Sequence, residues 1–510
     1  MPTLFATTRL LAVHLPGRDV PDGTLDVNLD GHRVWSTPVR WAAGPMIAVA
    51  WPRALRPYLR GRTHLTVTDS ATGEVIAEQD VRFPGNGRVD VSDARGRKLA
   101  VNKWDRLGPT LDSGDSGVQD RLLDSAVALV EQLQGWGYPV YAVGGTLLGA
   151  KRNGQLMPHD DDIDLAWLCD ETTMADVSLA SYEMERRLTQ AGHTVVRHSL
   201  AHLQVTYFDE AGFTDHYIDI FTGFHTEDGQ YNQPFALRGE LPRETLVPTS
   251  TIEIGGRTLP APARPEAWLE FAYGPSWLVP DPSFKFVTPP STLRLFETTF
   301  GVYNRQRVWW EKHYEQLAER EPSSGADDGV GDVSRFLQML PAGAPVIELG
   351  CGDGRLTERI AAAGHPVRAF DYSHEALRLA RQTRPENVTY DYLNTNDRHG
   401  VLRLALDLLE EGQDVWFFAS RMLHDVPPNG RESIYVLLRA VLGERTKAYM
   451  TFYSDPHPHR DSQNPETWHL PLKTLFTETR RFGLSFHALG STDVSTPYGR
   501  RTRQTVVLWR

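Results

Sequence analysis

Residues 1–112 contain short runs in which apolar and polar side chains alternate, the pattern of half-buried β-strands. Residues 25–29 and 63–68 are two such runs, and Gly, Pro and Asp residues separate the runs from one another. The pattern predicts a small β-sandwich-like accessory domain. No residue types used in catalysis are concentrated there, so we expect this domain to have a docking or packing role.

A helical pattern begins after a Gly/Ser/Asp-rich stretch at 112–117. Apolar residues then recur near helical spacing, which predicts a helix over about 118–135. From 138 to about 290 the pattern is mixed, and runs of β-formers predict strands at 140–143, 163–168, 203–208 and 217–221. We predict a central α+β domain over residues 113–300.

The last third of the chain has a strand–turn–helix–strand order that is typical of parallel α/β sheets. It follows a helical bridge and linker over 301–332, in which 322–331 is rich in Gly, Ser and Asp. A buried strand at 345–349, a glycine-rich turn, a helix and a second strand at 367–371 come next. The order predicts an α/β Rossmann-like domain over residues 333–510, with a doubly wound sheet.

Composition agrees with a multidomain globular protein, because 510 residues at roughly 150 residues per domain suggest about three domains. The formal net charge of −12 comes without a long basic run, so we expect no nucleic-acid partner. Only two cysteines occur, Cys169 and Cys351, which excludes a disulfide framework and suits a reducing compartment.

No apolar run reaches transmembrane length and no signal peptide is evident. We expect a cytoplasmic location, with peripheral association at the inner membrane face if the substrate is a lipid-linked polymer.

Most of the chemical information lies between residues 141 and 166, where a glycine pair precedes a run of acids. A predicted strand runs into Gly144 and Gly145, whose lack of side chains lets the backbone approach a phosphate closely. The acidic run extends from Asp160, and Asp162 and Asp164 are two residues apart on a predicted strand. Their carboxylates should therefore share one face and bind one hard divalent cation, Mg²⁺ or Mn²⁺.

Asp219 is the expected third carboxylate, because it lies between apolar residues of a later strand and needs a partner or a metal there. Three carboxylates around a cation would neutralise phosphate charge and hold the attacking and leaving oxygens in line. Asp219 is also a candidate to receive the proton of an acceptor hydroxyl. For an isolated acidic triplet the alternative is a solvated turn or a calcium loop. The combination with the glycine pair favours a catalytic metal site.

The central segment resembles the LicD/fukutin-type phosphotransferases of the polymerase-beta-like nucleotidyltransferase superfamily, over roughly residues 118–290. The matching motifs are GGTLLGA at 144–150 with Arg152, PHDDDIDL at 158–165, IDIF at 218–221, YGPSW at 273–277 and PDP at 280–282. The resemblance implies transfer of a phospho-alcohol, such as phosphocholine or ribitol phosphate, from a CDP-alcohol to a sugar or glycan hydroxyl. CMP would be released.

The resemblance also implies roles for individual residues. It assigns the metal to Asp162, Asp164 and Asp219. One departure from the family is His159, where tryptophan is usual, and this leaves the donor alcohol open. A nucleotidyltransferase that acts at the α-phosphorus of a nucleotide is the alternative activity. The residues expected to contact the substrate are Gly144, Gly145, Thr146, Lys151 and Arg152.

A second cluster of chemical residues lies at 345–357, where a predicted strand carrying Glu348 runs into a glycine-rich turn. Such a turn lets a cofactor lie against backbone at the carboxyl edge of the sheet. Asp371 ends the second predicted strand and suits hydrogen bonds from ribose hydroxyls. We expect a nucleoside cofactor, with NAD or FAD as competitors and a purely structural turn as the alternative. The glycines of the turn are Gly350, Gly352 and Gly354.

The order ELGCGDG at 348–354 resembles the first motif of class I S-adenosylmethionine-dependent methyltransferases, over roughly residues 333–510. The resemblance makes Asn394, after a strand at 387–390, a candidate adenine contact. His424 lies beyond a fourth predicted strand at 414–419 and is a candidate general base. A hydrogen-bonded loop histidine is the alternative there.

The Asp-Pro-Pro-Tyr signature of nucleic-acid amino methyltransferases is absent, since DVPPN at 425–429 differs in order and has no tyrosine. O-methylation of a small molecule or glycan is therefore favoured. The leading hypothesis is a bifunctional enzyme of glycan biosynthesis, in which a phosphotransferase and a methyltransferase act on the same product. The alternative is a methyltransferase-like domain that only binds.

Overall fold

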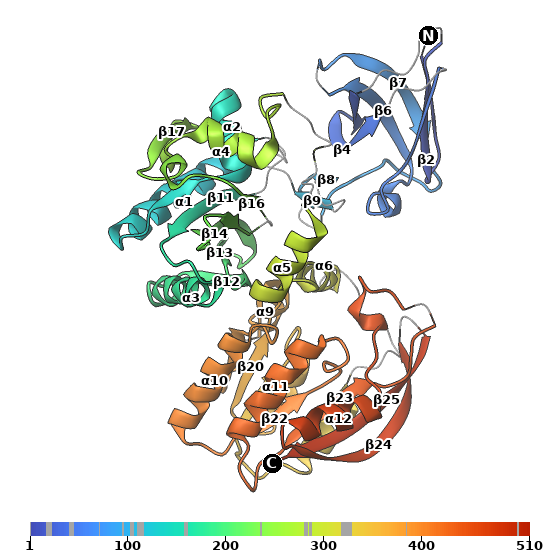
Figure 1. The fold of residues 1–510 in the computed structure, drawn as a ribbon. Helices are drawn as coiled ribbons and strands as arrows, with labels where there is room; N and C mark the ends of the chain where they lie inside the picture. Colours follow the sequence, from blue (N-terminus) through green and yellow to red (C-terminus); the bar gives the residue numbers. More distant parts are fainter. Residues whose placement is uncertain are drawn as a thin grey trace. The chain divides into compact units, whose positions relative to one another are not determined.

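The computed structural model describes most of the chain, and its residues group into two compact units, shown in Figure 1. The first unit is Met1–Phe208 with Asp215–Gly301, and the second is Asp209–Thr214 with Val302–Arg510. The described residues are 2–16, 23–39, 45–70, 72–93, 96–101, 107–109, 117–157, 162–234, 237–279, 284, 288–317, 329–383, 385–458, 460–496 and 499–510.

The N-terminal β-rich region has two main antiparallel sheets, with strand orders β1-β2-β5 and β4-β3-β6-β7, and a short β8-β9 pair. Apolar side chains from both sheets form one core, among them Leu11 and Val13 from the first and Val27 and Val67 from the second. The runs expected at 25–29 and 63–68 lie in β3 and β6. The strands are β1 (Thr3–Ala6), β2 (Leu10–His14), β3 (Gly23–Leu29), β4 (His32–Val39), β5 (Met46–Ala50), β6 (Arg62–Asp69), β7 (Val75–Arg82), β8 (Leu99–Val101) and β9 (Leu107–Pro109).

The central region is built on a mixed sheet with the strand order β10-β11-β14-β13-β12, extended by β15 and β16, and has a separate β17-β18 hairpin. Its strands are β10 (Val140–Ala142), β11 (Ile163–Cys169), β12 (Thr194–Ser199), β13 (His202–Phe208), β14 (Thr214–His225), β15 (Tyr231–Gln233), β16 (Leu237–Gly239), β17 (Ser250–Ile254) and β18 (Arg257–Ala261). Its helices are α1 (Val118–Gly135), α2 (Gly144–Asn153), α3 (Met174–Gln190), α4 (Pro265–Tyr273) and α5 (Pro290–Phe300).

Strand β11 is the central element of this sheet, because every one of its residues is buried. It pairs in parallel with β14 and antiparallel with β10. Helix α1 covers the sheet with the apolar face that the helical spacing predicted, including Leu122, Leu123 and Val130. The parallel register places Asp164 directly opposite Asp219.

The C-terminal region is an α/β domain with a seven-stranded sheet of order β21-β20-β19-β22-β23-β25-β24. The first five strands in this order are parallel, and β25 runs antiparallel to both of its neighbours. The strands are β19 (Val346–Leu349), β20 (Val367–Asp371), β21 (Val388–Tyr392), β22 (Trp416–Ala419), β23 (Ala448–Tyr453), β24 (Ser485–Thr496) and β25 (Gly499–Trp509).

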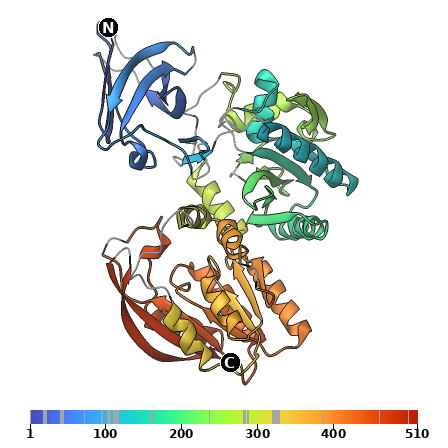
Figure 2. The ribbon, with the colours of Figure 1, turned by 180° about the vertical axis from the view of Figure 1, so that it is seen from behind.

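Helices cover both faces of this sheet, which Figures 1 and 2 show from opposite sides. One core lies between the sheet and α10, α11 and α12, and the other between the sheet and α7, α8 and α9. The helices of the second unit are α6 (Arg307–Leu317), α7 (Val330–Leu337), α8 (Arg355–Ala362), α9 (His374–Ala380), α10 (Arg398–Glu411), α11 (Pro428–Val441) and α12 (Leu472–Arg481).

The sheet order reverses at β19, which has β20 on one side and β22 on the other. Open α/β sheets bind ligands outside the carboxyl ends of the strands at such a switch point. Helix α6, which the sequence assigned to a bridge, packs on α9 within the second unit. Most of the linker expected at 322–331 lies outside the described residues, and Val330 and Gly331 begin α7.

Cys169 and Cys351 are both free and buried. In the described part of the chain, no helix combines the length and the apolar character needed to cross a membrane.

Candidate functional site

Three carboxylates meet at the amino-terminal end of β11. Asp162 immediately precedes the strand, Asp164 is its second residue, and Asp219 lies opposite Asp164 on β14. One carboxylate oxygen from each lies within 4.8 Å of the others. The structure thus brings together the three acids that the sequence singled out, and metal binding by them stays a prediction. His159 and Asp160 lie outside the described residues.

The glycine pair at the start of α2 makes room for Asp164. Gly144 has a φ of +56°, and a Cβ at this position would collide with the Asp164 carboxylate. Gly145 N–H donates a hydrogen bond of 2.8 Å to Asp164 Oδ2, and Asp164 N–H donates one of 2.9 Å to Thr146 Oγ1. The amino terminus of a helix also favours a nearby negative charge. In this structure the glycines therefore fix the position of one acid of the cluster.

Asp219 on β14 is surrounded by polar groups from the neighbouring strand β13 and from β12, the strand beyond it. Gln204 Nε2 donates a hydrogen bond of 3.1 Å to Asp219 Oδ1, and His202 Nε2 lies 3.4 Å from the same oxygen. The His198 ring lies 4.6 Å from the His202 ring. Burial alone raises the pKa of Asp219, but the charges of the two histidines and the hydrogen bonds outweigh burial and lower it. The carboxylate is therefore ionised at neutral pH.

His198, His202 and Gln204 were not identified from the sequence. A usable signal existed, because residues two apart on one strand share a face, and His202 and Gln204 begin β13. What the sequence could not supply was the pairing of β13 beside β14, which brings that face to Asp219.

The two basic residues expected to contact phosphate are engaged elsewhere in this structure. Lys151 Nζ lies 2.5 Å from Glu266 Oε1 on α4. Arg152 donates hydrogen bonds to the carbonyl oxygens of Trp277, at 3.0 Å from Nε, and of Val279, at 3.1 Å from Nη2. These contacts hold α4 and the segment after it. A phosphate contact by either residue stays a prediction, and residues 280–282 of the expected closing motif lie outside the described residues.

The glycine-rich loop of the C-terminal domain is tightly enclosed. Gly352 has a φ of +57°, and a Cβ there would lie 2.6 Å from the Tyr314 hydroxyl of α6. Its N–H donates a hydrogen bond of 2.9 Å to Asp371 Oδ2, which ties the loop to the end of β20. Gly350 and Gly354 belong to the same loop, between β19 and α8.

Both acids expected at the cofactor site have raised pKa values. Burial raises the pKa of Asp371 to about 6, although Gly352 N–H and Ser373 N–H donate hydrogen bonds to its carboxylate. Burial raises the pKa of Glu348 to about 8, while Thr357 Oγ1 donates a hydrogen bond of 2.6 Å to its Oε2. Glu348 therefore acts in this structure as a largely protonated acid that joins β19 to α8.

Residues 303–314 lie along the edge where a cofactor was expected. Tyr314 contacts Gly352, and Asn394 Nδ2 donates a hydrogen bond of 2.9 Å to Tyr303 O. The Glu311 carboxylate accepts hydrogen bonds from Ser373 Oγ and from the first two backbone N–H groups of α9, at 2.7 to 3.0 Å. Sequence analysis assigned this segment to a bridge and not to the cofactor site, because it precedes the glycine-rich motif by about 40 residues.

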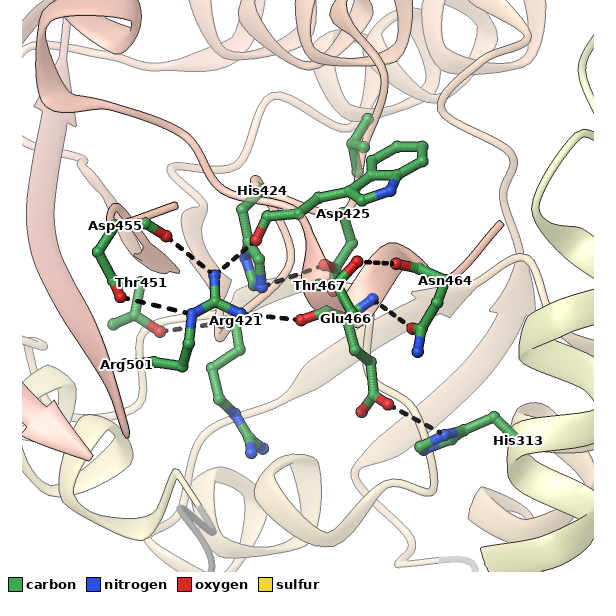
Figure 3. A network of polar contacts seen from close by, with 12 residues as sticks. His313, Arg421, His424, Asp425, Thr451, Asp455, Asn464, Glu466, Thr467 and Arg501 are labelled. Atoms are coloured by element: carbon green, nitrogen blue, oxygen red, sulfur yellow. Dashed lines mark hydrogen bonds and ion pairs between the residues drawn. The ribbon is translucent and has the colours of Figure 1, made fainter. Parts of the chain in front are cut away.

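His424 lies in the turn after β22, at the centre of the polar network in Figure 3. Its side chain is only 1% exposed, and its Nε2 lies 3.1 Å from Asp425 Oδ1. Burial lowers the pKa of His424 well below its usual value, and the charges of Arg501 and Arg421 lower it further. Burial raises the pKa of Asp425 well above its usual value. His424 is thus a neutral imidazole in an enclosed position, and its role as a base stays a prediction.

Arg501, which the sequence did not single out, organises the rest of this network (Figure 3). It donates hydrogen bonds to Glu466 O at 3.0 Å and to Trp468 O at 2.7 Å, and its guanidinium lies over the Tyr453 ring. His313 Nδ1 of α6 lies 3.8 Å from Glu466 Oε2. The loop before α12 is therefore held between β25 and α6.

Two family models match the chain. The model for the LicD/FKTN/FKRP nucleotidyltransferase domain matches residues 137–264, and a methyltransferase-domain model matches residues 346–444. No curated protein matches the sequence.

Similar solved structures include three S-adenosylmethionine-dependent methyltransferases. The one from Anabaena variabilis is 17% identical over 41% of this chain and 94% of its own, with a TM-score of 0.32. The one from Methanosarcina mazei is 16% identical over 34% and 96%, with a TM-score of 0.28. The TehB-like one from Corynebacterium glutamicum is 17% identical over 40% and 100%, with a TM-score of 0.29. The two family models by themselves identify a LicD-family domain and a methyltransferase domain joined in this chain.

Proposed function

We propose that the central domain transfers a phospho-alcohol from a CDP-alcohol to a hydroxyl group of a glycan or sugar, and that Mg²⁺ or Mn²⁺ is required. The observation that carries the proposal is the meeting of Asp162, Asp164 and Asp219 within 4.8 Å, inside the segment that matches the LicD family. Hard divalent cations prefer several carboxylate oxygens. The three acids therefore fit such a cation.

Asp162, Asp164 and Asp219 would hold the cation, which supplies charge neutralisation at the transferred phosphate when bound. Gly145 N–H positions Asp164, and Gln204 positions Asp219. These contacts would hold the ligand set in place before the substrate arrives. The acceptor oxygen forms its bond to phosphorus as the bond from phosphorus to the CMP oxygen breaks, and Asp219 is the candidate to receive the acceptor proton.

Product analysis tests this proposal. The protein is incubated with CDP-choline, CDP-glycerol or CDP-ribitol and glycan fragments, with and without Mg²⁺ or Mn²⁺, and CMP is followed by chromatography. Release of CMP only with the metal supports the proposal and names the donor class. Release of pyrophosphate from a nucleoside triphosphate, with no CMP from any CDP-alcohol, would favour the alternative of nucleotidyl transfer at the α-phosphorus.

We infer that the C-terminal domain binds S-adenosylmethionine at the switch point of its sheet and transfers the methyl group to an oxygen of a small molecule or glycan. The supporting observation is the enclosed glycine loop joined to Asp371. Each oxygen of the Asp371 carboxylate keeps an acceptor site for a ribose hydroxyl beside its backbone hydrogen bond. Gly350, Gly352 and Gly354 would contact the cofactor, with Asn394 at the adenine. The cofactor, when bound, supplies an electrophilic methyl group.

Calorimetry separates a methyltransferase from a binding module. Titration with S-adenosylmethionine is followed by a methyl-transfer assay on the glycan product of the first reaction. Saturable heat with methyl transfer supports the proposal, and binding without transfer to any acceptor supports the alternative of a binding module. The absence of saturable heat would remove the cofactor assignment. We place both activities in the cytoplasm, acting on the same product.

A further inference from the structure

The N-terminal β-rich region contains a pocket of about 580 Å³ whose lining includes three arginines and no acid. A volume of this size is in the range of small-molecule sites. The pocket is formed by the turn between β1 and β2, the short 3₁₀ helix Arg56–Tyr58 with the residues after it, and the segment that follows β7. Its lining residues are Thr8, Arg9, Arg56, Leu59, Arg60, Pro84 and Gly85.

Backbone hydrogen bonds join the three segments of this pocket. Trp51 N–H donates to Arg9 O at 3.1 Å, and Phe83 N–H donates to Gly61 O at 2.8 Å. Leu59, which lines the pocket, and Trp51 are almost fully buried. Arg56 Nε donates to Trp51 O at 3.1 Å, which orients its guanidinium. The arginines are therefore carried by an ordered framework.

The arginines of the pocket have no acidic partner in the described part of the β-rich region. Four of the other basic residues of this region do form ion pairs with aspartates, namely Arg33, Arg88, Arg97 and Lys98. Arg9 and Arg60 are exposed, and Arg56 is half-buried. Three like charges in one pocket repel one another unless an anion neutralises them. Asp26, Asp30, Asp90 and Asp93 of the described part are paired with other basic residues, so the anion in this pocket would be a ligand.

The net charge of the β-rich region also favours an anionic ligand. Residues 1–109 carry 15 Lys and Arg against 11 Asp and Glu, a net charge of +4, whereas the whole chain carries −12. The region is thus the basic part of an acidic protein. A negatively charged polymer would be attracted to this region and repelled by the rest of the chain.

Arginine side chains are well suited to phosphate groups. The planar guanidinium donates two parallel hydrogen bonds to phosphate oxygens, and three arginines in one pocket can bind both free oxygens of a phosphodiester and neutralise its charge. The Thr8 hydroxyl adds a donor at the rim. We propose that this pocket binds a phosphate group of a phosphodiester-linked polymer, so that the N-terminal region holds the anionic product or acceptor of the central domain. This inference rests on the proposed phosphotransferase.

The test measures binding separately from catalysis. A hexamer of glycerol phosphate is titrated into the full-length Asp162→Asn/Asp164→Asn protein, without a nucleotide donor, by isothermal titration calorimetry. The variant Arg9→Gln/Arg60→Gln removes two exposed charges from the pocket and leaves Arg56 and its hydrogen bond to Trp51 in place. The matched control, Arg88→Gln/Lys98→Gln, removes the same charge from residues outside the pocket lining.

We expect at least a tenfold loss of hexamer affinity in the pocket variant, at most a threefold loss in the control, and weaker binding at higher salt. A galacturonate hexamer, with carboxylates in place of phosphates, should bind at least tenfold more weakly than the phosphate hexamer. Equal losses in both variants, equal binding of the two hexamers, or no binding of the phosphate hexamer would each overturn the inference. Binding without any CMP release by the wild type would instead count only against the proposed phosphotransferase.

Discussion

The central and C-terminal sheets both bring buried carboxylates together beside parallel strands, but the two groups have opposite electrostatic surroundings. In the central sheet, His202, His198 and Gln204 lower the pKa of Asp219 in spite of its burial. In the C-terminal sheet, the hydrogen bonds that Glu348 and Asp371 accept do not offset burial, which raises their pKa values to about 8 and about 6.

The difference shows that burial alone does not determine the charge of an acid. The central cluster lies at the amino-terminal end of β11 and keeps at least one carboxylate ionised, as a divalent cation requires. The C-terminal acids lie at or near the carboxyl ends of β19 and β20, and there they accept hydrogen bonds. The carboxylate of Asp371 can accept hydrogen bonds from the hydroxyl groups of a nucleoside.

The largest expected effect comes from Gly144→Ala. The new Cβ would collide with the Asp164 carboxylate and displace one acid of the cluster. We expect metal-dependent CMP release to fall by about 100-fold, the usual cost of misplacing a catalytic group by about 1 Å. Gly154→Ala is the matched control, because Gly154 also has positive φ but open space around it. Similar losses in the two variants would show that backbone strain, and not the acid cluster, is responsible.

A second substitution compares the two glycine sites directly. Gly352→Ala would place a Cβ 2.6 Å from the Tyr314 hydroxyl, so we expect about 10-fold weaker binding of S-adenosylmethionine by calorimetry. Tyr314→Phe in the same chain removes the colliding oxygen and should restore part of the affinity. Gly364→Ala, at a positive-φ glycine with open space, should leave affinity within about threefold. If Tyr314→Phe does not restore affinity in the double variant, the contact between Tyr314 of α6 and Gly352 cannot explain the loss.

The raised pKa of Glu348 predicts a pH dependence of stability. The folded protein holds this proton to a higher pH than the unfolded chain does, so stability falls as pH rises from about 4.5 to about 8. Glu348→Gln cannot ionise, and its loss of stability between pH 5 and pH 8 should be smaller by on the order of 2 kcal/mol. Thermal unfolding across this pH range measures the difference. The exposed Glu410→Gln should follow the wild-type curve, and a Glu348→Gln curve with the wild-type slope would refute the prediction.

The smallest expected effect is that of Arg152→Lys. Arg152 donates hydrogen bonds to the carbonyl oxygens of Trp277 and Val279. A lysine at this position could make only part of these hydrogen bonds, because it lacks the planar set of donors. We expect a loss of stability of about 1 kcal/mol and a change in kcat/KM of less than about 10-fold. Steady-state kinetics with the CDP-alcohol donor provides the check. A much larger rise in KM at unchanged stability would instead support the phosphate contact that was predicted for Arg152 from the sequence.

Local patterns predicted many of the elements correctly. The strand expected at 367–371 is β20, and the helix expected at 118–135 is α1, because each has a clear period and clear ends. The meeting of Asp162 and Asp164 with Asp219 was also predictable, since an acid in a buried strand needs a partner. The prediction placed Asp162 and Asp164 on one face of a strand. In the structure only Asp164 lies in β11, and Asp162 immediately precedes it.

Contacts between distant segments could not be predicted. The pairing of β13 beside β14 brings His202 to Asp219, and the packing of α6 on α9 brings Glu311 to the edge of the C-terminal sheet. Neither arrangement has a local signal, because both depend on which surfaces pack together after the strands form. The same holds for Arg152, whose partners Trp277 and Val279 are far away in sequence.

The most direct test asks whether the three central carboxylates form one metal-dependent centre. Binding of Mn²⁺ is measured by electron paramagnetic resonance, and CMP release from the CDP-alcohol donor is measured in parallel, for the wild type and for Asp162→Asn/Asp164→Asn. The control is Asp170→Asn, which alters an exposed acid just after the other end of β11.

We predict that the double variant binds Mn²⁺ at least about 100-fold more weakly, because it loses two of three proposed ligands, and that CMP release disappears with it. The Asp170→Asn protein should match the wild type in both measurements. Metal-dependent CMP release that persists at the wild-type rate in the double variant would contradict the assignment of the cluster as the catalytic centre.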